Sequence, residues 1–305
     1  MALRQRKVVF ARINRRRPNQ DTLAMRSFAE DMAELARSRR TAFTEPATDA
    51  STAKTWFAAD MDIQAGRDFM IGTLGFSEPA ERREFNPTEW SWIKGDTEVS
   101  DTASEETVVP FAVDLRDSQR WVAFATAARL QQAGFTKGLQ EILNQAVVIQ
   151  GHMPTEWDVD LITSRSSVDA WLHNNPLVHK MRRTVKFSNP GRDIDADRQE
   201  MRALAARRKT EEFAAARNGV LNTESEEFRS KLNGTETGDL ELELSARGQH
   251  GVAEALFKSK EQADQKQIDD FGRDLMHGMQ IVLGALREYV AAKPPAAGYE
   301  QASEG

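Results

Sequence analysis

LELELSAR, residues 240–247, is the segment that decides the fold class of this chain. Apolar and polar side chains alternate over its first seven positions, so one face of the segment is apolar and the other polar. This period of two is typical of a β-strand with one buried and one solvated face. A Gly248–Gly251 turn leads into Val252–Phe257, which predicts a hairpin. Apolar residues then recur every three or four positions over Ile268–Tyr289, which predicts a long final helix.

The same two periodicities divide the rest of the chain into short strands and helices. Strands are predicted over residues 7–13, 69–76, 108–115, 121–124, 158–162 and 181–187. Helices are predicted over residues 22–40, 127–148, 168–173 and 192–218, the last one polar and ended by Gly219. We therefore expect an α+β fold with mixed or antiparallel sheets flanked by long helices.

The length of 305 residues corresponds to about two domains of roughly 150 residues each. We predict an N-terminal α+β domain over residues 1–150 and a C-terminal α+β domain over residues 151–292, with a disordered tail over 293–305. The second domain would contain the basic strand, the helix after it and the long final helix. The longest apolar run is far shorter than the ~20 residues that span a bilayer, and the first residues lack the apolar core of a signal peptide. A cytoplasmic location is therefore expected.

The charges of the chain are segregated. The net charge is −6, from 41 Lys and Arg against 47 Asp and Glu, yet residues 1–40 carry +7 and residues 180–209 carry +6. Residues 78–117 and 211–270 each carry −7. Two basic segments in an acidic protein indicate a face for a polyanion. The alternative is that these basic segments pair with the protein's own acidic blocks, which would suit a structural or adaptor protein.

Few catalytic chemistries are compatible with this sequence. The absence of cysteine excludes disulfides, thiol nucleophiles and cysteine-ligated metals. No phosphate-binding glycine loop is present, and the five histidines show no spacing typical of metal ligands. A nuclease with a strand-borne acid pair, Glu241 and Glu243, remains an alternative, although no lysine follows at the usual spacing. We therefore predict a non-enzymatic protein without a cofactor or a metal.

The basic segments supply the candidate binding residues. On a strand over residues 181–187, Arg182, Thr184 and Lys186 share one face, a narrow ladder suited to a phosphate backbone. A flexible arm would add Arg15, Arg16 and Arg17. No motif for reading base sequence is present, so we expect binding to be non-specific.

Four segments of the chain resemble a known family in order and local pattern. They are SFAEDMAEL (27–35), VVPFAVDLRDSQRWVAFA (108–125), LHNNPLVHKMRRTVKFSNP (172–190) and DLELELSARGQHGVAEALFKSKEQ (239–262). Together they resemble the RexA proteins of the lambda-type phage exclusion system, whose fold is similar to that of RdgC.

This resemblance implies a homodimer that binds double-stranded DNA without sequence preference. It further implies a role in prophage-encoded exclusion of other phages, as a sensor that acts with a RexB-like membrane channel partner. The DNA-binding residues it implies lie on the basic strand and the predicted helix after it: Lys180, Arg182, Arg183, Lys186, Arg192, Arg198, Arg202, Arg207, Arg208 and Lys209.

Overall fold

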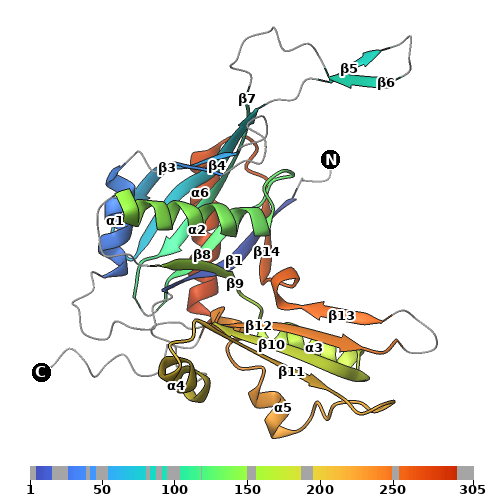
Figure 1. Cartoon of the computed structure of the whole chain (residues 1–305). Helices are drawn as coiled ribbons and strands as arrows, with labels where there is room; N and C mark the ends of the chain where they lie inside the picture. Colours follow the sequence, from blue (N-terminus) through green and yellow to red (C-terminus); the bar gives the residue numbers. More distant parts are fainter. Residues whose placement is uncertain are drawn as a thin grey trace, which may run out of the picture.

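The computed structural model describes residues 5–15, 27–38, 42–45, 54–79, 83–86, 91–94, 104–117, 119–149, 156–186, 195–248 and 254–293. Within these ranges the chain forms two antiparallel sheets with helices packed on them, so the predicted α+β class is confirmed (Figure 1). A separate two-stranded ribbon consists of β5 (Arg83–Asn86) and β6 (Ser91–Lys94).

The larger sheet has eight strands in the order β14-β1-β8-β7-β4-β3-β2, with β9 also paired to β1. β1 joins two partners along one edge, because its first half pairs with β14 and its second half with β9. The sheet thus combines strands from both sides of residue 150, while the domain division itself stays a prediction. The strands are β1 (Gln5–Arg15), β2 (Ala42–Thr44), β3 (Thr55–Ile63), β4 (Phe69–Pro79), β7 (Ser104–Asp114), β8 (Trp121–Ala125), β9 (Trp157–Leu161) and β14 (Gln265–Asp269).

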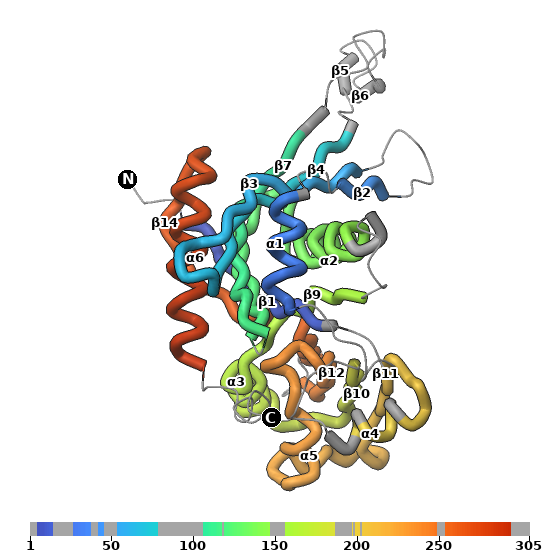
Figure 2. Tube along the Cα trace, turned by 90° about the vertical axis from the view of Figure 1, so that its left-hand side faces the viewer, coloured from blue at the N-terminus to red at the C-terminus, as the bar shows by residue number. Residues whose placement is uncertain are grey.

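Helices cover both faces of the large sheet (Figure 2). Helices α1 (Phe28–Ser38) and α2 (Gln132–Ile149) lie on one face, and α6 (Leu275–Ala291) lies on the other. The alternation along β1 explains this arrangement, because Val9 and Ile13 enter the core beneath α1 and α2 while Val8 and Phe10 enter the core beneath α6.

The smaller sheet has four strands in the order β11-β10-β12-β13: β11 (Arg208–Ala214), β10 (Val178–Lys186), β12 (Leu240–Ala246) and β13 (Ala255–Lys258). The hairpin predicted from LELELSAR is confirmed, since β12 pairs with β13 and its leucines are buried. Helix α3 (Arg165–Asn174) and helix α5 (Glu226–Ser230) contribute buried side chains to the same core as Leu242 and Leu244. Two 3-10 turns, η2 (Thr235–Thr237) and η4 (Ser259–Glu261), flank the hairpin.

The prediction of a single helix over residues 192–218 is wrong beyond the first turns of that helix. Helix α4 (Asp195–Ala203) is followed by a turn in which Ala205 has a left-handed φ of 49° and the amide of Ala206 donates to the carbonyl of Met201. This is a helix-terminating motif that usually carries glycine, so its alanine gave no sequence signal. The chain then enters β11, which pairs with β10.

The final helix is shorter than predicted. Ile268 belongs to β14, and Phe271 lies in the turn before the helix, which includes Gly272 at a φ of 58°. Asp274 caps α6 by accepting a hydrogen bond from the amide of His277. Among the described residues, the structure has no helix long and apolar enough to cross a membrane. Most of the predicted tail, residues 294–305, lies outside the described residues.

Candidate functional site

A cleft of about 610 Å³ lies where the large sheet and α2 meet the small sheet. One wall is the face of α2 that carries Ala133, Thr136, Lys137 and Gln140, residues spaced so that they share one side of a helix. The other walls are β9, the end of β10, the start of β11, β12 and η4. Residues far apart in the sequence therefore meet in one place.

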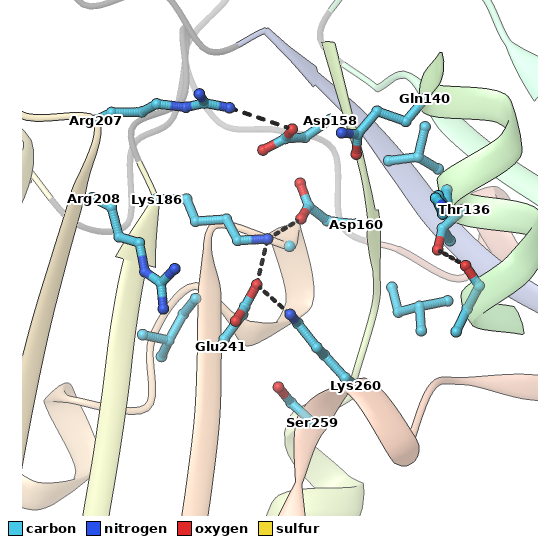
Figure 3. A pocket seen from close by; sticks show the side chains of 16 residues that line it. Thr136, Gln140, Asp158, Asp160, Lys186, Arg207, Arg208, Glu241, Ser259 and Lys260 are labelled. Carbon is cyan, nitrogen blue, oxygen red and sulfur yellow. Dashed lines mark hydrogen bonds and ion pairs between the residues drawn. The ribbon is translucent and has the colours of Figure 1, made fainter. Parts of the chain in front are cut away.

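Lys186 occupies the centre of the cleft (Figure 3). Its Nζ lies 2.6 Å from Asp160 Oδ1 on the large sheet and pairs also with Glu241 on β12. Burial of Lys186 opposes its positive charge, but Asp160 and then Glu241 outweigh burial and raise the pKa of Lys186. The ammonium form of Lys186 is therefore favoured at neutral pH.

The floor of the cleft is built to hold Asp160 in place. The buried side chain of Asn14 donates through Nδ2 to Asp160 Oδ2 at 2.9 Å. Gly238, at a φ of 75°, approaches so closely that a Cβ there would lie 2.7 Å from Asp160 Cβ. Only glycine accommodates both this backbone conformation and this contact without strain.

Four further cations line the cleft. Lys260 lies 3.0 Å from Glu241, Lys137 lies 2.9 Å from Glu45, and Arg207 pairs with Glu156. Arg208 points toward the cleft, and within the described part of the chain its guanidinium makes no hydrogen bond or ion pair. Burial raises the pKa of Glu241, but Lys186 and Lys260 outweigh burial and lower it. The acids of the floor are thus neutralised, while Arg208 is not.

Two of the predicted DNA-binding residues, Arg183 and Lys209, form ion pairs that hold α4 on the small sheet. The Arg183 side chain is 3% exposed and pairs with Asp197 of α4 and, at 3.0 Å, with Glu211 of β11. Lys209 lies 2.9 Å from Asp197 and 2.6 Å from Glu200. We call Arg183, Lys209, Asp197 and Glu211 the α4 clamp.

The clamp also shifts the pKa values of its members. Burial alone would raise the pKa of Asp197 and of Glu211, but hydrogen bonds from Lys209 and the charge of Arg183 lower both. Hydrogen bonds to Glu200 and Asp197 raise the pKa of Lys209 above its ordinary value. Asp197, Glu211 and Lys209 are therefore charged at neutral pH, and the side chains of the clamp are occupied with one another.

The solvent-facing side of the small sheet carries two more of the predicted cations. Lys180 lies 3.1 Å from Glu212 of β11, and Arg182 lies 4.0 Å from Glu243 of β12. The strands on either side of β10 thus supply an acid to each basic residue of the ladder. Glu243, one of the two proposed nuclease acids, belongs to this surface, whereas Glu241 lines the cleft.

The remaining predicted cations are spread over the molecule. Arg15 ends β1, and Arg198 and Arg202 lie on α4. Arg16, Arg17 and Arg192 lie outside the described residues. The structure thus brings Lys186, Arg207 and Arg208 together, and it adds Lys137, Lys260 and Asp160, which sequence reasoning did not single out.

Lys137 and Lys260 lie outside the two basic segments of the sequence, so the charge pattern did not indicate them. Lys260 is one of seven cations inside the acidic segment 211–270, and Lys137 lies on a helix with little net charge. The one available signal was the Asp158–Val159–Asp160 pattern, two acids on one face of a predicted strand. Among the described residues, no group of three or more His, Asp or Glu side chains is arranged to hold a metal ion.

The fold and the cleft define a two-sheet α+β protein with a cation-lined cleft between the sheets. Residues 94–267 match a family described as "Domain of unknown function (DUF4747)". This match covers more than half of the chain, so the protein belongs to the DUF4747 family. All residues that line the cleft fall within the matched span. A comparison with curated proteins finds no match.

Proposed function

We propose that this protein binds double-stranded DNA without sequence preference, through cations at the rim of the cleft. The observation that carries the proposal is the convergence of Lys137, Arg207, Arg208 and Lys260, from separate elements, around one cleft. Arg208 has no partner there among the described residues. Phosphate contacts by such side chains give affinity without sequence information.

The proposal places the principal phosphate contacts at the cleft rather than along the whole basic segment. Arg183 and Lys209 are occupied in the α4 clamp, and Lys180 and Arg182 are matched by glutamates. Contacts from Arg15, Arg16, Arg17, Arg192, Arg198 and Arg202 remain predictions. The wider role, a homodimeric sensor of phage exclusion that acts with a RexB-like membrane partner, rests on the resemblance to RexA proteins.

A gel-shift titration with unrelated duplexes at about 50 and 200 mM salt tests the proposal, with Mg²⁺ present throughout. Each phosphate contact adds affinity and steepens the fall of affinity with salt. The double substitution Arg207→Glu and Arg208→Glu removes such contacts, so it should weaken binding at both salt concentrations. Arg217→Glu is a matched control, because Arg217 is exposed beyond the opposite end of β11. If the wild-type protein binds no duplex at low salt, the proposal is wrong and the adaptor interpretation remains.

A nuclease is the second candidate, because Asp158, Asp160 and Glu241 line the same cleft. Carboxylates that converge on one point commonly hold Mg²⁺ for phosphate chemistry, but among the described residues no three acids are arranged to do so. The ammonium of Lys186, however, lies between Asp160 and Glu241, where a cation would otherwise bind. Cleavage of the duplexes in the same titration, abolished by Glu241→Gln, would favour the nuclease.

A further inference from the structure

The size of the cleft determines which form of nucleic acid can enter it. A volume of about 610 Å³ lies within the roughly 300–1,000 Å³ typical of small-molecule sites. A double helix is too wide to enter such a space and contacts only its rim. A single nucleotide, in contrast, fits inside.

One end of the cleft is suited to a phosphate. Arg208 on β11 lies directly across from Lys186 on β10 in the sheet register, and like charges in such a pair repel each other. The structure places two carboxylates against Lys186, while Arg208 has none among the described residues. The planar guanidinium of arginine matches phosphate geometry with two parallel hydrogen bonds. An anion bound at Arg208 would relieve this repulsion.

The opposite wall is suited to a base. Gln140 of α2 points into the cleft, and its amide has no hydrogen-bond partner among the described residues (Figure 3). An amide offers both a donor and an acceptor to the edge of a base. The Thr136 hydroxyl donates to the carbonyl of Ala133 and keeps a free acceptor side. The partly buried Leu161 of β9 adds apolar surface on the same side.

We infer that the cleft takes one nucleotide that bears a terminal phosphate, with the phosphate at Arg208 and the base at Gln140. A terminal phosphate carries more charge than a phosphodiester within a strand. A strand that ends in the cleft also has to enter it only once, whereas a strand bound at an internal nucleotide would have to enter and leave. The ligand is either a free nucleoside 5′-monophosphate or the phosphorylated end of a DNA strand. For a DNA end, the inference rests on the proposed function.

Calorimetric titration with a 5′-deoxynucleoside monophosphate, with the corresponding nucleoside and with inorganic phosphate tests the inference directly. We expect the monophosphate to bind and the nucleoside not to bind. Arg208→Gln should weaken monophosphate binding about tenfold or more, as expected for the loss of one charge-assisted contact, and Arg217→Gln should leave it unchanged. Gln140→Ala should weaken the monophosphate but not inorganic phosphate. Equal binding by wild-type protein and Arg208→Gln would overturn the inference.

Three DNA forms distinguish failure of this inference from failure of the proposed function. They are a covalently closed circle, a linear duplex with 5′-phosphates and the same duplex with 5′-hydroxyls. We expect the circle to bind and the phosphorylated linear duplex to bind more tightly than the hydroxyl form. Binding of the circle without preference for the phosphorylated end, and without nucleotide binding, would contradict the inference alone. Nucleotide binding without binding of the circle would contradict the proposed function and assign the cleft to free nucleotides.

Discussion

The α4 clamp and the cleft use basic residues from the same thirty-residue segment in opposite ways. In the clamp, Arg183 and Lys209 are surrounded by Asp197, Glu211 and Glu200, and no charge is left for a ligand. In the cleft, Arg208 faces open space. Position on the sheet decides this difference, because Arg183 points toward the covered face and Arg208 lies at the exposed start of an edge strand. A basic segment therefore indicates a binding surface only at those cations that the fold leaves unmatched.

Removal of Arg183 should have the largest effect on stability. Arg183→Met leaves Asp197 and Glu211 with less positive charge in a buried site, and the loss of one partner of a buried pair typically costs about 3–5 kcal/mol. Urea denaturation would measure the change in the free energy of unfolding. Arg182→Met, at the neighbouring exposed position, is the control and should cost less than about 1 kcal/mol. Equal losses for the two variants would show that the clamp does not stabilise the fold.

A methyl group at Gly238 should disturb the floor of the cleft. Gly238→Ala places Cβ against Asp160 Cβ and forces alanine into a left-handed conformation, so we expect a loss of about 1–3 kcal/mol. The shift of Asp160 should also weaken its pairing with Lys186. Thermal unfolding of the variant gives the stability, and Gly66→Ala is a control with a similar φ of 93° but open space around Cβ. If the two variants lose the same stability, backbone strain alone explains the effect.

The acid side of the stability profile should report the paired carboxylates. Asp197, Glu211 and Glu241 all have lowered pKa values in the folded protein, against ordinary values of 3.8 for Asp and 4.5 for Glu. Their contribution is fully present above these ordinary values and is lost as the pH falls through the lower folded values. We expect denaturation midpoints to be constant between about pH 6 and 7 and to fall below about pH 4.5. In Arg183→Met this fall should be shallower, and an unchanged slope would contradict the assignment.

The smallest effect is expected on the solvent-facing side of the small sheet. Lys180→Met breaks only an exposed pair with Glu212, which is worth about 0–1 kcal/mol. Its denaturation midpoint should match that of the wild-type protein at high salt, where exposed pairs are screened. A loss as large as that of Arg183→Met would remove the contrast between the covered and the open face of this sheet.

The sequence predicted those elements whose periodicity is undisturbed. LELELSAR and its hairpin were found because one face of β12 is buried and the other is wet. The end of α4 was missed because Ala205 takes the left-handed position of a glycine, and β11 was missed because its charged residues resemble a polar helix. Ile268 and Phe271 fit the spacing of the final helix although they lie on a strand and in a turn.

The site was predicted only in part, for a related reason. Lys186, Arg207 and Arg208 were found because they belong to a basic block. The pairing of Arg183 with Asp197 depends on the docking of α4, which local pattern does not contain. Lys137 and Lys260 come from other segments and meet the cleft only through tertiary structure.

Salt-dependent binding of one closed duplex to Arg208→Gln and Arg182→Gln, followed by fluorescence anisotropy from about 50 to 200 mM salt, tests the central claim most directly. We expect Arg208→Gln to weaken binding and to reduce the slope of log affinity against log salt by about one. Because Glu243 already matches the charge of Arg182, Arg182→Gln should leave affinity and slope near those of the wild-type protein. Equal losses in both variants, or a loss in Arg182→Gln alone, would contradict the claim that Arg208, the cleft cation without an acidic partner among the described residues, makes a phosphate contact.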